Sequence, residues 1–195
     1  YAPNKKYIHL LGDFNNWQRH PDYQLKKMLN GNWEVHLPDY AMAHTQLYKL
    51  LIEWEGGSGE RIPAWARRVV QDEQTKIFSA QVWNPIQQYK FKTKKFTPQT
   101  EPLLIYECHI GMSGKEEKVA TYEEFRTSVL PRIAKGGYNC IQIMAIQEHP
   151  YYGSFGYHVS SFFAASSRFG TPEELKHLID DAHGMGIAVI MDIVH

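Results

Sequence analysis

Hydrophobic and polar residues alternate over short runs in the first half of the chain. Segments 7–11, 48–54 and 76–83 are rich in hydrophobic residues, many of them at every second position, and Asn30-Gly31 gives a tight-turn signal. A period of two is typical of β-strands with one buried face, and Asn-Gly favours a hairpin. Short strands at this spacing predict an immunoglobulin-like β-sandwich over residues 1–96.

The pattern changes to nearly continuous hydrophobic runs after a polar segment rich in Lys, Thr and Pro. The runs cover residues 103–109, 139–146 and 187–194. Hydrophobic strands without alternation are typical of parallel sheets buried on both faces. We therefore expect a linker over residues 97–102 and a second domain over residues 103–195.

Two helices are predicted between these strands from the residues at their ends. Thr121 with Glu124 has the spacing of a capping box, and Thr171-Pro172-Glu173-Glu174 combines a cap, an N1 proline and an acidic first turn. Pro131 lies inside the first helix, where it removes a backbone donor and predicts a kink.

The order β-α-β-α-β fits either a doubly wound parallel sheet or the opening of a (β/α)₈ barrel. A barrel needs ~250 residues, so the barrel interpretation implies an incomplete one that holds strands one to three. The fold class is thus multidomain, β followed by α/β. In either architecture, functional side chains belong at the carboxyl ends of the strands.

Five ionisable candidates lie at those ends. Glu107 and His109 follow the first strand, Glu148 and His149 follow the second, and Asp192 lies in the third. An ionised carboxylate in a hydrophobic strand is costly unless it has a partner, so Asp192 is the residue that most needs an explanation. An ion pair within the structure explains such an acid as well as a binding role does.

Charge and composition narrow the classes of partner. Lys and Arg total 21 and Asp and Glu total 21, so the chain offers no basic face for nucleic acid. No hydrophobic run approaches the ~20 residues of a membrane span, and the start lacks the order of a signal peptide. We expect a cytoplasmic protein. Because the first residue is Tyr1 rather than Met, a leader peptide that has been cleaved off is kept as an alternative. Aromatic residues reach 13%, and exposed rings suit stacking on sugars.

No cofactor or metal is expected. His149, His158 and His195 do not form the HxxxH or HxH pairs of zinc sites, and Gly184-Met185-Gly186 precedes a strand, whereas a dinucleotide loop follows one. Both cysteines, Cys108 and Cys140, lie in hydrophobic runs and are predicted to be buried reduced thiols.

Several motifs together resemble a known family. The second half resembles the start of the catalytic barrel of the α-amylase superfamily, most closely the eukaryotic-type glycogen (starch) branching enzymes. The first half resembles the glycogen-binding β-sandwich that precedes that barrel. The matching segments are 12–17, 31–34 and 61–66 in the first half, and 106–111, 129–133, 137–146 and the unbroken run 148–174 in the second.

The resemblance implies a retaining transglycosylase that cuts an α-1,4-glucan and rejoins the piece through an α-1,6 bond. In that family the nucleophile and the acid/base lie at the ends of strands four and five, with a helping aspartate after strand seven. We therefore expect no catalytic carboxylate in this chain, no activity from the chain alone, and a need for the remaining barrel strands.

The resemblance also implies roles for four residues. Tyr157 matches the tyrosine that stacks on the sugar at the cleavage site, where Gly156 would leave the ring accessible. Asp192 matches the invariant aspartate of the first family motif, which puts His195 on a variable position. Trp17 matches a glucan-stacking tryptophan of related modules, and Trp65 is a weaker candidate.

Three alternatives stay open from the sequence. The chain could act as a glycogen-binding module without a catalytic contribution, or belong to a debranching relative in the same superfamily. Outside carbohydrate chemistry, it could be a small α/β protein with a complete doubly wound sheet.

Overall fold

The computed structural model describes residues 1–98 and 102–194, which form two compact units, Tyr1–Ile86 and Gln87–His195. The division after Ile86 comes earlier than the boundary at residue 96 that composition predicts. The reason is local, because backbone and side-chain groups of Tyr89, Lys92 and Thr93 bond to a helix of the second unit.

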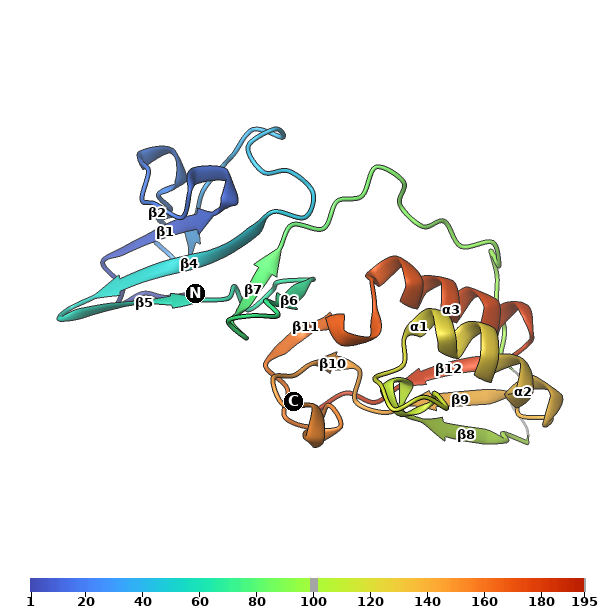
Figure 1. The fold of residues 1–195 in the computed structure, drawn as a ribbon. Helices are drawn as coiled ribbons and strands as arrows, with labels where there is room; N and C mark the ends of the chain where they lie inside the picture. Colours follow the sequence, from blue (N-terminus) through green and yellow to red (C-terminus); the bar gives the residue numbers. More distant parts are fainter. Residues whose placement is uncertain (99–101, 195) are drawn as a thin grey trace. The chain divides into compact units, whose positions relative to one another are not determined.

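The first unit is an antiparallel β-sandwich, as the alternation predicts (Figure 1). Its main sheet has the order β1-β4-β7-β6, with β5 also paired to β4, and a separate hairpin joins β2 to β3. The strands are β1 (Tyr7–Gly12), β2 (Lys26–Lys27), β3 (Trp33–Glu34), β4 (Leu47–Trp54), β5 (Gly57–Arg61), β6 (Val69–Gln71) and β7 (Phe78–Gln81). Short 3-10 turns cover Asp13–Asn15 and Pro21–Tyr23.

Turn residues set the ends of these strands. Gly31 has φ +83° in the turn between β2 and β3, which confirms the hairpin expected from Asn30-Gly31. The strand expected from residue 76 begins at Phe78, because Lys76 has φ +60°, a left-handed conformation that cannot continue a strand.

The second unit is built around a three-stranded parallel sheet, in the order β12-β9-β8. Its strands are β8 (Ile105–Cys108), β9 (Cys140–Ile143) and β12 (Ala188–Met191), and its helices are α1 (Tyr122–Glu124), α2 (Leu130–Lys135) and α3 (Pro172–Gly184). The helices lie on one face of the sheet (Figure 1). An antiparallel pair, β10 (Gln147–Glu148) and β11 (Ser161–Ala165), follows β9 in the chain, and 3-10 turns cover Ile110–Met112, Tyr152–Ser154 and Ser167–Phe169.

Both capping predictions are confirmed. Thr121 and Thr171 each accept a hydrogen bond from the backbone N–H of the glutamate three residues later, and that glutamate accepts one in return. The predicted kink at Pro131 takes the form of a π-helical turn over Phe125–Val129, directly before α2. A proline without an N–H cannot continue the α-helical hydrogen-bond ladder, so the interruption falls one turn before it.

The core of the second unit lies between the sheet and the helices. Phe125, Leu130, Ile141 and Leu178 are fully buried there, and both cysteines are free and buried, as expected. The strands were expected to be covered on both faces. Within the described residues, however, the helices cover only one face, and Ile105 and Ile190 on the other face are 43% and 42% exposed.

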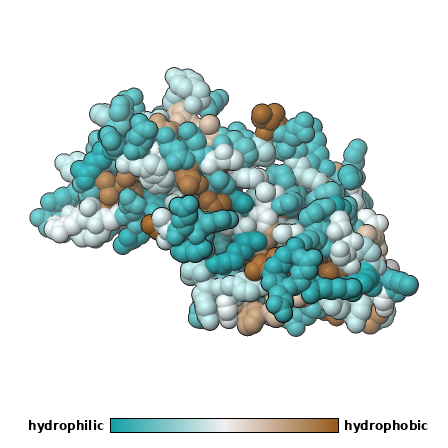
Figure 2. All heavy atoms as spheres, viewed as in Figure 1, coloured by the Kyte–Doolittle hydropathy of each residue, from teal (hydrophilic) through white to brown (hydrophobic). Residues whose placement is uncertain are grey.

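The surface drawn in Figure 2 is mostly hydrophilic, with hydrophobic residues in separate small patches. Among the residues that the structure describes, no helix has the length and hydrophobicity needed to cross a membrane.

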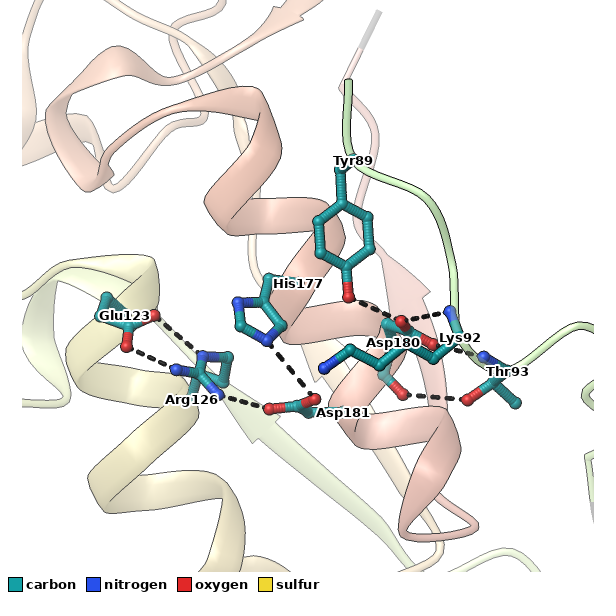
Figure 3. Close-up of polar contacts among 8 residues, drawn as sticks. All are labelled: Tyr89, Lys92, Thr93, Glu123, Arg126, His177, Asp180 and Asp181. Atoms are coloured by element: carbon teal, nitrogen blue, oxygen red, sulfur yellow. Dashed lines mark hydrogen bonds and ion pairs between the residues drawn. The ribbon is translucent and has the colours of Figure 1, made fainter. Parts of the chain in front are cut away.

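A buried carboxylate fastens residues 89–93 to α3 (Figure 3). Asp180 is 2% exposed and accepts hydrogen bonds from the Tyr89 hydroxyl (2.6 Å), the Lys92 N–H (2.7 Å) and the Thr93 N–H (2.9 Å). Burial alone would raise the pKa of Asp180, but these donors together hold the pKa well below its ordinary value.

We expect Asp180→Asn to lower the free energy of unfolding of the second unit by about 2–4 kcal/mol at pH 7, because several hydrogen bonds to a buried charge weaken together. Because folding lowers the pKa of Asp180, its contribution is present above the ordinary value of 3.8 and is lost as the pH falls below it. Urea denaturation of both proteins by circular dichroism, near pH 7 and below pH 3.8, measures the difference. A difference that does not shrink in acid would contradict this account.

The chain supplies an internal control for that experiment. All five tryptophans lie between residues 17 and 83, so tryptophan fluorescence reports the first unit alone. Its denaturation curve should be the same in the wild type and in Asp180→Asn.

Candidate functional site

Asp192 lies directly after β12, at the carboxyl end of the parallel sheet. Its N–H donates to the carbonyl of Ile143 (2.9 Å), which extends the pairing with β9 by one residue. The predicted strand 187–194 is therefore shorter in the structure, and the carboxylate of Asp192 emerges at the sheet's edge rather than inside it.

Tyr157 is the hydrogen-bond partner of Asp192, a pairing that the sequence alone did not predict. The Tyr157 hydroxyl donates to Asp192 Oδ2 at 3.0 Å, and the tyrosine is 40% exposed. Partial burial raises the pKa of Tyr157, and so do the hydrogen bond to Asp192 and the charges of Asp192 and Glu107. The structure thus brings the two predicted substrate-binding residues into contact.

The backbone before Tyr157 is held close to the end of β9. Gly156 has φ +92°, and a Cβ at this position would lie 1.9 Å from the carbonyl oxygen of Ala145. Phe155 is also left-handed, with φ +54°. Gly156 was expected to leave space beside the tyrosine ring. Its role in the structure is instead to let the loop approach Ala145. This close approach fixes the position of the backbone next to Tyr157.

Glu148, a buried residue of β10, joins the two ends of loop 149–160. Glu148 is fully buried, and its oxygens accept hydrogen bonds from the Ser167 N–H (2.7 Å), the Ser167 hydroxyl (2.8 Å), the Ser166 hydroxyl (3.2 Å) and the His149 N–H (3.1 Å). Its own carbonyl accepts from the Ser160 N–H (2.9 Å). The Glu148 carbonyl therefore closes loop 149–160 at its base, and the Glu148 carboxylate ties that base to the residues after β11.

A neighbouring amide connects the loop's base to the segment after β12. Gln147 Oε1 accepts from the Val194 N–H (2.9 Å), and Gln147 Nε2 donates to the Phe162 carbonyl (3.1 Å). Since Val194 follows Asp192 by two residues, this bridge fixes the backbone just after Asp192, and the tyrosine contact fixes its carboxylate.

The two histidine candidates at the strand ends lie below the surface. His109 is 8% exposed, and Tyr152, Phe155 and Phe169 contact its ring edge-on at 5.5–5.9 Å between centroids. Burial, and secondarily the nearby His149, lower the pKa of His109 and favour the neutral ring. His149 is fully buried, and its Nδ1 lies 2.9 Å from the Gln147 carbonyl oxygen. The His109 ring therefore packs against two aromatic residues of loop 149–160, whereas the His149 ring lies next to Phe169.

Metal binding was considered for this region from the sequence. Within residues 1–98 and 102–194, no three His, Cys, Asp or Glu side chains gather as a metal site would require. His195, one of the histidines considered, lies outside the described residues.

Trp17 in the first unit is held by a short polar network. Its Nε1 donates to Asp13 Oδ1 (2.9 Å), and Asp13 Oδ2 accepts from the N–H of Leu47 (2.7 Å) on β4. Asn16 and Trp17 have φ of +52° and +58°, so the loop is fixed in a strained conformation that presents a partly exposed ring. Lys49 Nζ lies 6.0 Å from that ring.

Trp65 lies on a different surface of the same unit. It is 75% exposed and lines a groove of about 350 Å³ together with Tyr48, Trp83 and Arg67. Tyr48 and Lys49 are consecutive on β4, so they project from opposite faces of the sheet. The structure therefore does not bring Trp17, which lies beside Lys49, together with Trp65.

Sequence reasoning missed the residues that hold these side chains in place. Asp13 follows β1 and precedes Trp17 by four residues, a spacing that a turn can close, so a local signal was present. Ser166 and Ser167, in contrast, are 18 and 19 residues from Glu148, and no pattern in the chain links them.

Two family models match the chain. Residues 1–66 match "Carbohydrate-binding module 48 (Isoamylase N-terminal domain)", and residues 127–195 match "Alpha amylase, catalytic domain". The two matches fall in the β-sandwich and in the parallel β-α unit, respectively.

Curated relatives match over the whole chain. A 1,4-alpha-glucan-branching enzyme of Dictyostelium discoideum is 45% identical over 201 residues, and one of Aspergillus oryzae is 50% identical over 205 residues. Each alignment covers 100% of this chain, which spans 29% of the length of either relative.

Solved structures share the fold. The pullulanase SAP of group B Streptococcus, solved in complex with maltotetraose, superposes with a TM-score of 0.75 at 20% identity. The superposition covers 99% of this chain and 31% of that chain.

We expect Gly156→Ala to destabilise the second unit by more than about 3 kcal/mol, because the added methyl meets a carbonyl oxygen as well as an unfavourable φ. Gly137→Ala is the matched control. Gly137 has φ +83° with nothing within 4 Å, so this change should cost only about 1 kcal/mol. Urea denaturation by circular dichroism measures both, and equal costs would rule out the close approach to Ala145.

We expect Asp192→Asn to lower the pKa of Tyr157 toward its ordinary value of 10.0, because a negative charge that opposes ionisation is removed. Carbon-13 NMR of tyrosine-labelled protein measures the titration, and Tyr157→Phe assigns the signal. Asp39→Asn, in the first unit, should leave it unchanged. An unaltered Tyr157 pKa in Asp192→Asn would show that the hydrogen bond is absent in solution.

Proposed function

We propose that this chain, which belongs with the 1,4-alpha-glucan-branching enzymes by homology over its whole length, is the N-terminal part of such an enzyme. The proposed enzyme forms α-1,6 branches in glycogen or starch by retaining transglycosylation. The observation that carries the proposal is the identity of 45–50% to branching enzymes across both units. The contact between Tyr157 and Asp192 supports it, because both residues lie where parallel β-α folds bind substrates.

In the proposed reaction, this chain binds and orients the glucan. The Tyr157 ring stacks on a glucose unit at the cleavage site, and its hydroxyl stays tied to Asp192. One Asp192 oxygen accepts that hydroxyl, which leaves the other free to accept from a sugar hydroxyl. Because this hydrogen bond already holds the Tyr157 side chain, the ring loses little conformational freedom on binding, which favours an ordered complex.

The bond-breaking groups would come from other residues of the parent enzyme. Retaining transfer needs a nucleophilic carboxylate and an acid/base carboxylate about 5 Å apart. We assign neither role to Glu107, Glu148 or Asp192. Glu148 is fully buried and saturated with hydrogen bonds, and one oxygen of Asp192 is already bonded to Tyr157. Later strands would supply both carboxylates and cover the open face of the sheet, and we expect this chain alone to be inactive.

The first unit is proposed as a second contact with α-glucan. Its match to a carbohydrate-binding module and the fixed, partly exposed Trp17 ring favour this role. Trp65 is the weaker candidate, because it faces a different surface of the sheet. A glucan-binding module that contributes nothing to catalysis is the second candidate function, and it rests on this unit alone.

A debranching relative is less favoured. Similarity to pullulanase at 20% identity supports a shared fold only, whereas the identity to branching enzymes is more than twice as high. A cytoplasmic location remains part of the proposal, and no cofactor is required by the chemistry proposed.

The experiment is a chimera in which this chain replaces the homologous segment of the Aspergillus oryzae enzyme. We expect the chimera to branch amylose, seen as a falling iodine absorbance, and the isolated chain to leave amylose unchanged. Tyr157→Ala in the chimera should reduce kcat/KM by about 100-fold, since a stacking contact at the reacting sugar is lost. A folded chimera without activity would refute the branching proposal.

Affinity electrophoresis in glycogen separates the second candidate. If the first unit binds glucan, Trp17→Ala should migrate faster through a glycogen gel than the wild type. Tyr40→Ala is the control, because Tyr40 is an aromatic residue of the same unit that is 89% exposed. Equal mobility of Trp17→Ala and wild type would remove Trp17 from the binding surface.

A further inference from the structure

A second pocket uses the same loop that carries Tyr157. It has a volume of about 480 Å³, and its nonpolar lining comes from Met112, Val119, Tyr152 and Phe155. This volume lies within the range of small-ligand sites, roughly 300–1,000 Å³. The lining comes from two loops at the carboxyl end of the sheet, the loop after β8 and loop 149–160. Tyr157 and Asp192 are not among the lining residues, so the pocket is separate from the site described above.

The aromatic wall of this pocket is held by packing contacts. His109 packs edge-on against both Tyr152 and Phe155, with centroid distances of 5.9 and 5.7 Å. The Tyr152 hydroxyl lies so close to Gly111 that a Cβ there would be 2.8 Å away. Phe155 is 40% exposed and left-handed, a conformation that is costly for an aromatic residue and that concentrates at functional sites.

The polar lining has mixed charge. Glu116, Glu117 and Lys118 contribute to it, and Lys118 Nζ lies 3.0 Å from Glu116 and 2.7 Å from Glu124. The lysine is therefore neutralised, and the pocket has no surplus of positive charge for a phosphate or a nucleic acid. Glu117 has no ion-pair partner in the described residues and is free to accept hydrogen bonds.

Two aromatic rings beside carboxylates match the chemistry of an uncharged sugar. The nonpolar C–H face of a glucose unit can pack on a ring, while its hydroxyls donate to carboxylate oxygens. The pocket and Tyr157 also share one loop, since residues 152–155 line the pocket and residue 157 bonds to Asp192. A glucan bound in the pocket would therefore contact the same loop that carries Tyr157.

We propose that the pocket lined by Met112, Tyr152 and Phe155 is an accessory binding site for a linear α-1,4-glucan. The choice of glucan over other sugars rests on the proposed function. The site would hold a segment of chain away from the reacting sugar, and Phe155 and Tyr152 would supply the stacking surfaces. Glu117 would accept hydrogen bonds from sugar hydroxyls.

Methionine-methyl NMR tests this proposal on the 195-residue chain with maltohexaose as the probe. The chain has six methionines, and Met112, which is 60% exposed, is the one that lines the pocket. Met112→Leu assigns its signal. We expect maltohexaose to shift the Met112 signal in a saturable manner, both in the wild type and in Tyr157→Ala.

Two variants measure the contacts. Phe155→Ala should weaken the binding seen at Met112 by about tenfold, which corresponds to about 1.4 kcal/mol. Glu117→Gln removes an exposed charge without touching the core, so it should fold normally and weaken binding by about threefold. Phe162→Ala, an aromatic residue that is 48% exposed on β11, is the matched control and should bind as the wild type does.

The outcomes separate this proposal from the branching function. A Met112 signal unmoved by maltohexaose overturns the accessory site, even if the chimera branches amylose. A saturable shift that Phe155→Ala and Glu117→Gln leave unaltered also overturns it, because the ligand would then not use the pocket. A shift weakened by both variants supports the site, even if the chimera proves inactive and the branching proposal falls.

Discussion

The buried carboxylate of Glu148 is the interaction on which the second unit's candidate site depends. A fully buried charge is costly unless its oxygens are satisfied, and here the hydroxyls and N–H groups of Ser166, Ser167 and His149 satisfy them. Meeting that requirement holds the residues after β11 against Glu148, while the Glu148 carbonyl accepts from the Ser160 N–H at the far end of loop 149–160. Loop 149–160 is therefore anchored to Glu148 at both of its ends, and it carries the Tyr157 that bonds to Asp192.

The elements of the fold were largely predictable because their signals are local. A capping box spans four residues and a strand run about eight, so Thr121, Thr171 and the three parallel strands could be found from the chain alone. The pairing of Tyr157 with Asp192 spans 35 residues, and the contact of Tyr89 with Asp180 spans 91. Such contacts follow from packing of elements already formed, and no periodicity encodes them.

The candidate site shows the same limit in a different way. Resemblance to a family supplied Tyr157, Asp192, Trp17 and Trp65 as separate residues, and their roles in binding stay predictions. The geometry joins the first pair and separates the second, because Tyr48 and Lys49 face opposite sides of one strand. Gly156 was interpreted as space for a ring, yet the close approach of Ala145 explains it better. In each case the missing information was a neighbour from another element.

The central claim is that Tyr157 and Asp192 form one preorganised surface for a glucose unit. A crystal structure of the chain soaked with maltohexaose tests it most directly. The account predicts a glucose ring stacked on Tyr157, with a hydroxyl within hydrogen-bond distance of Asp192 and the tyrosine–aspartate bond retained. A structure with maltohexaose bound elsewhere on the chain and none at Tyr157 would contradict it.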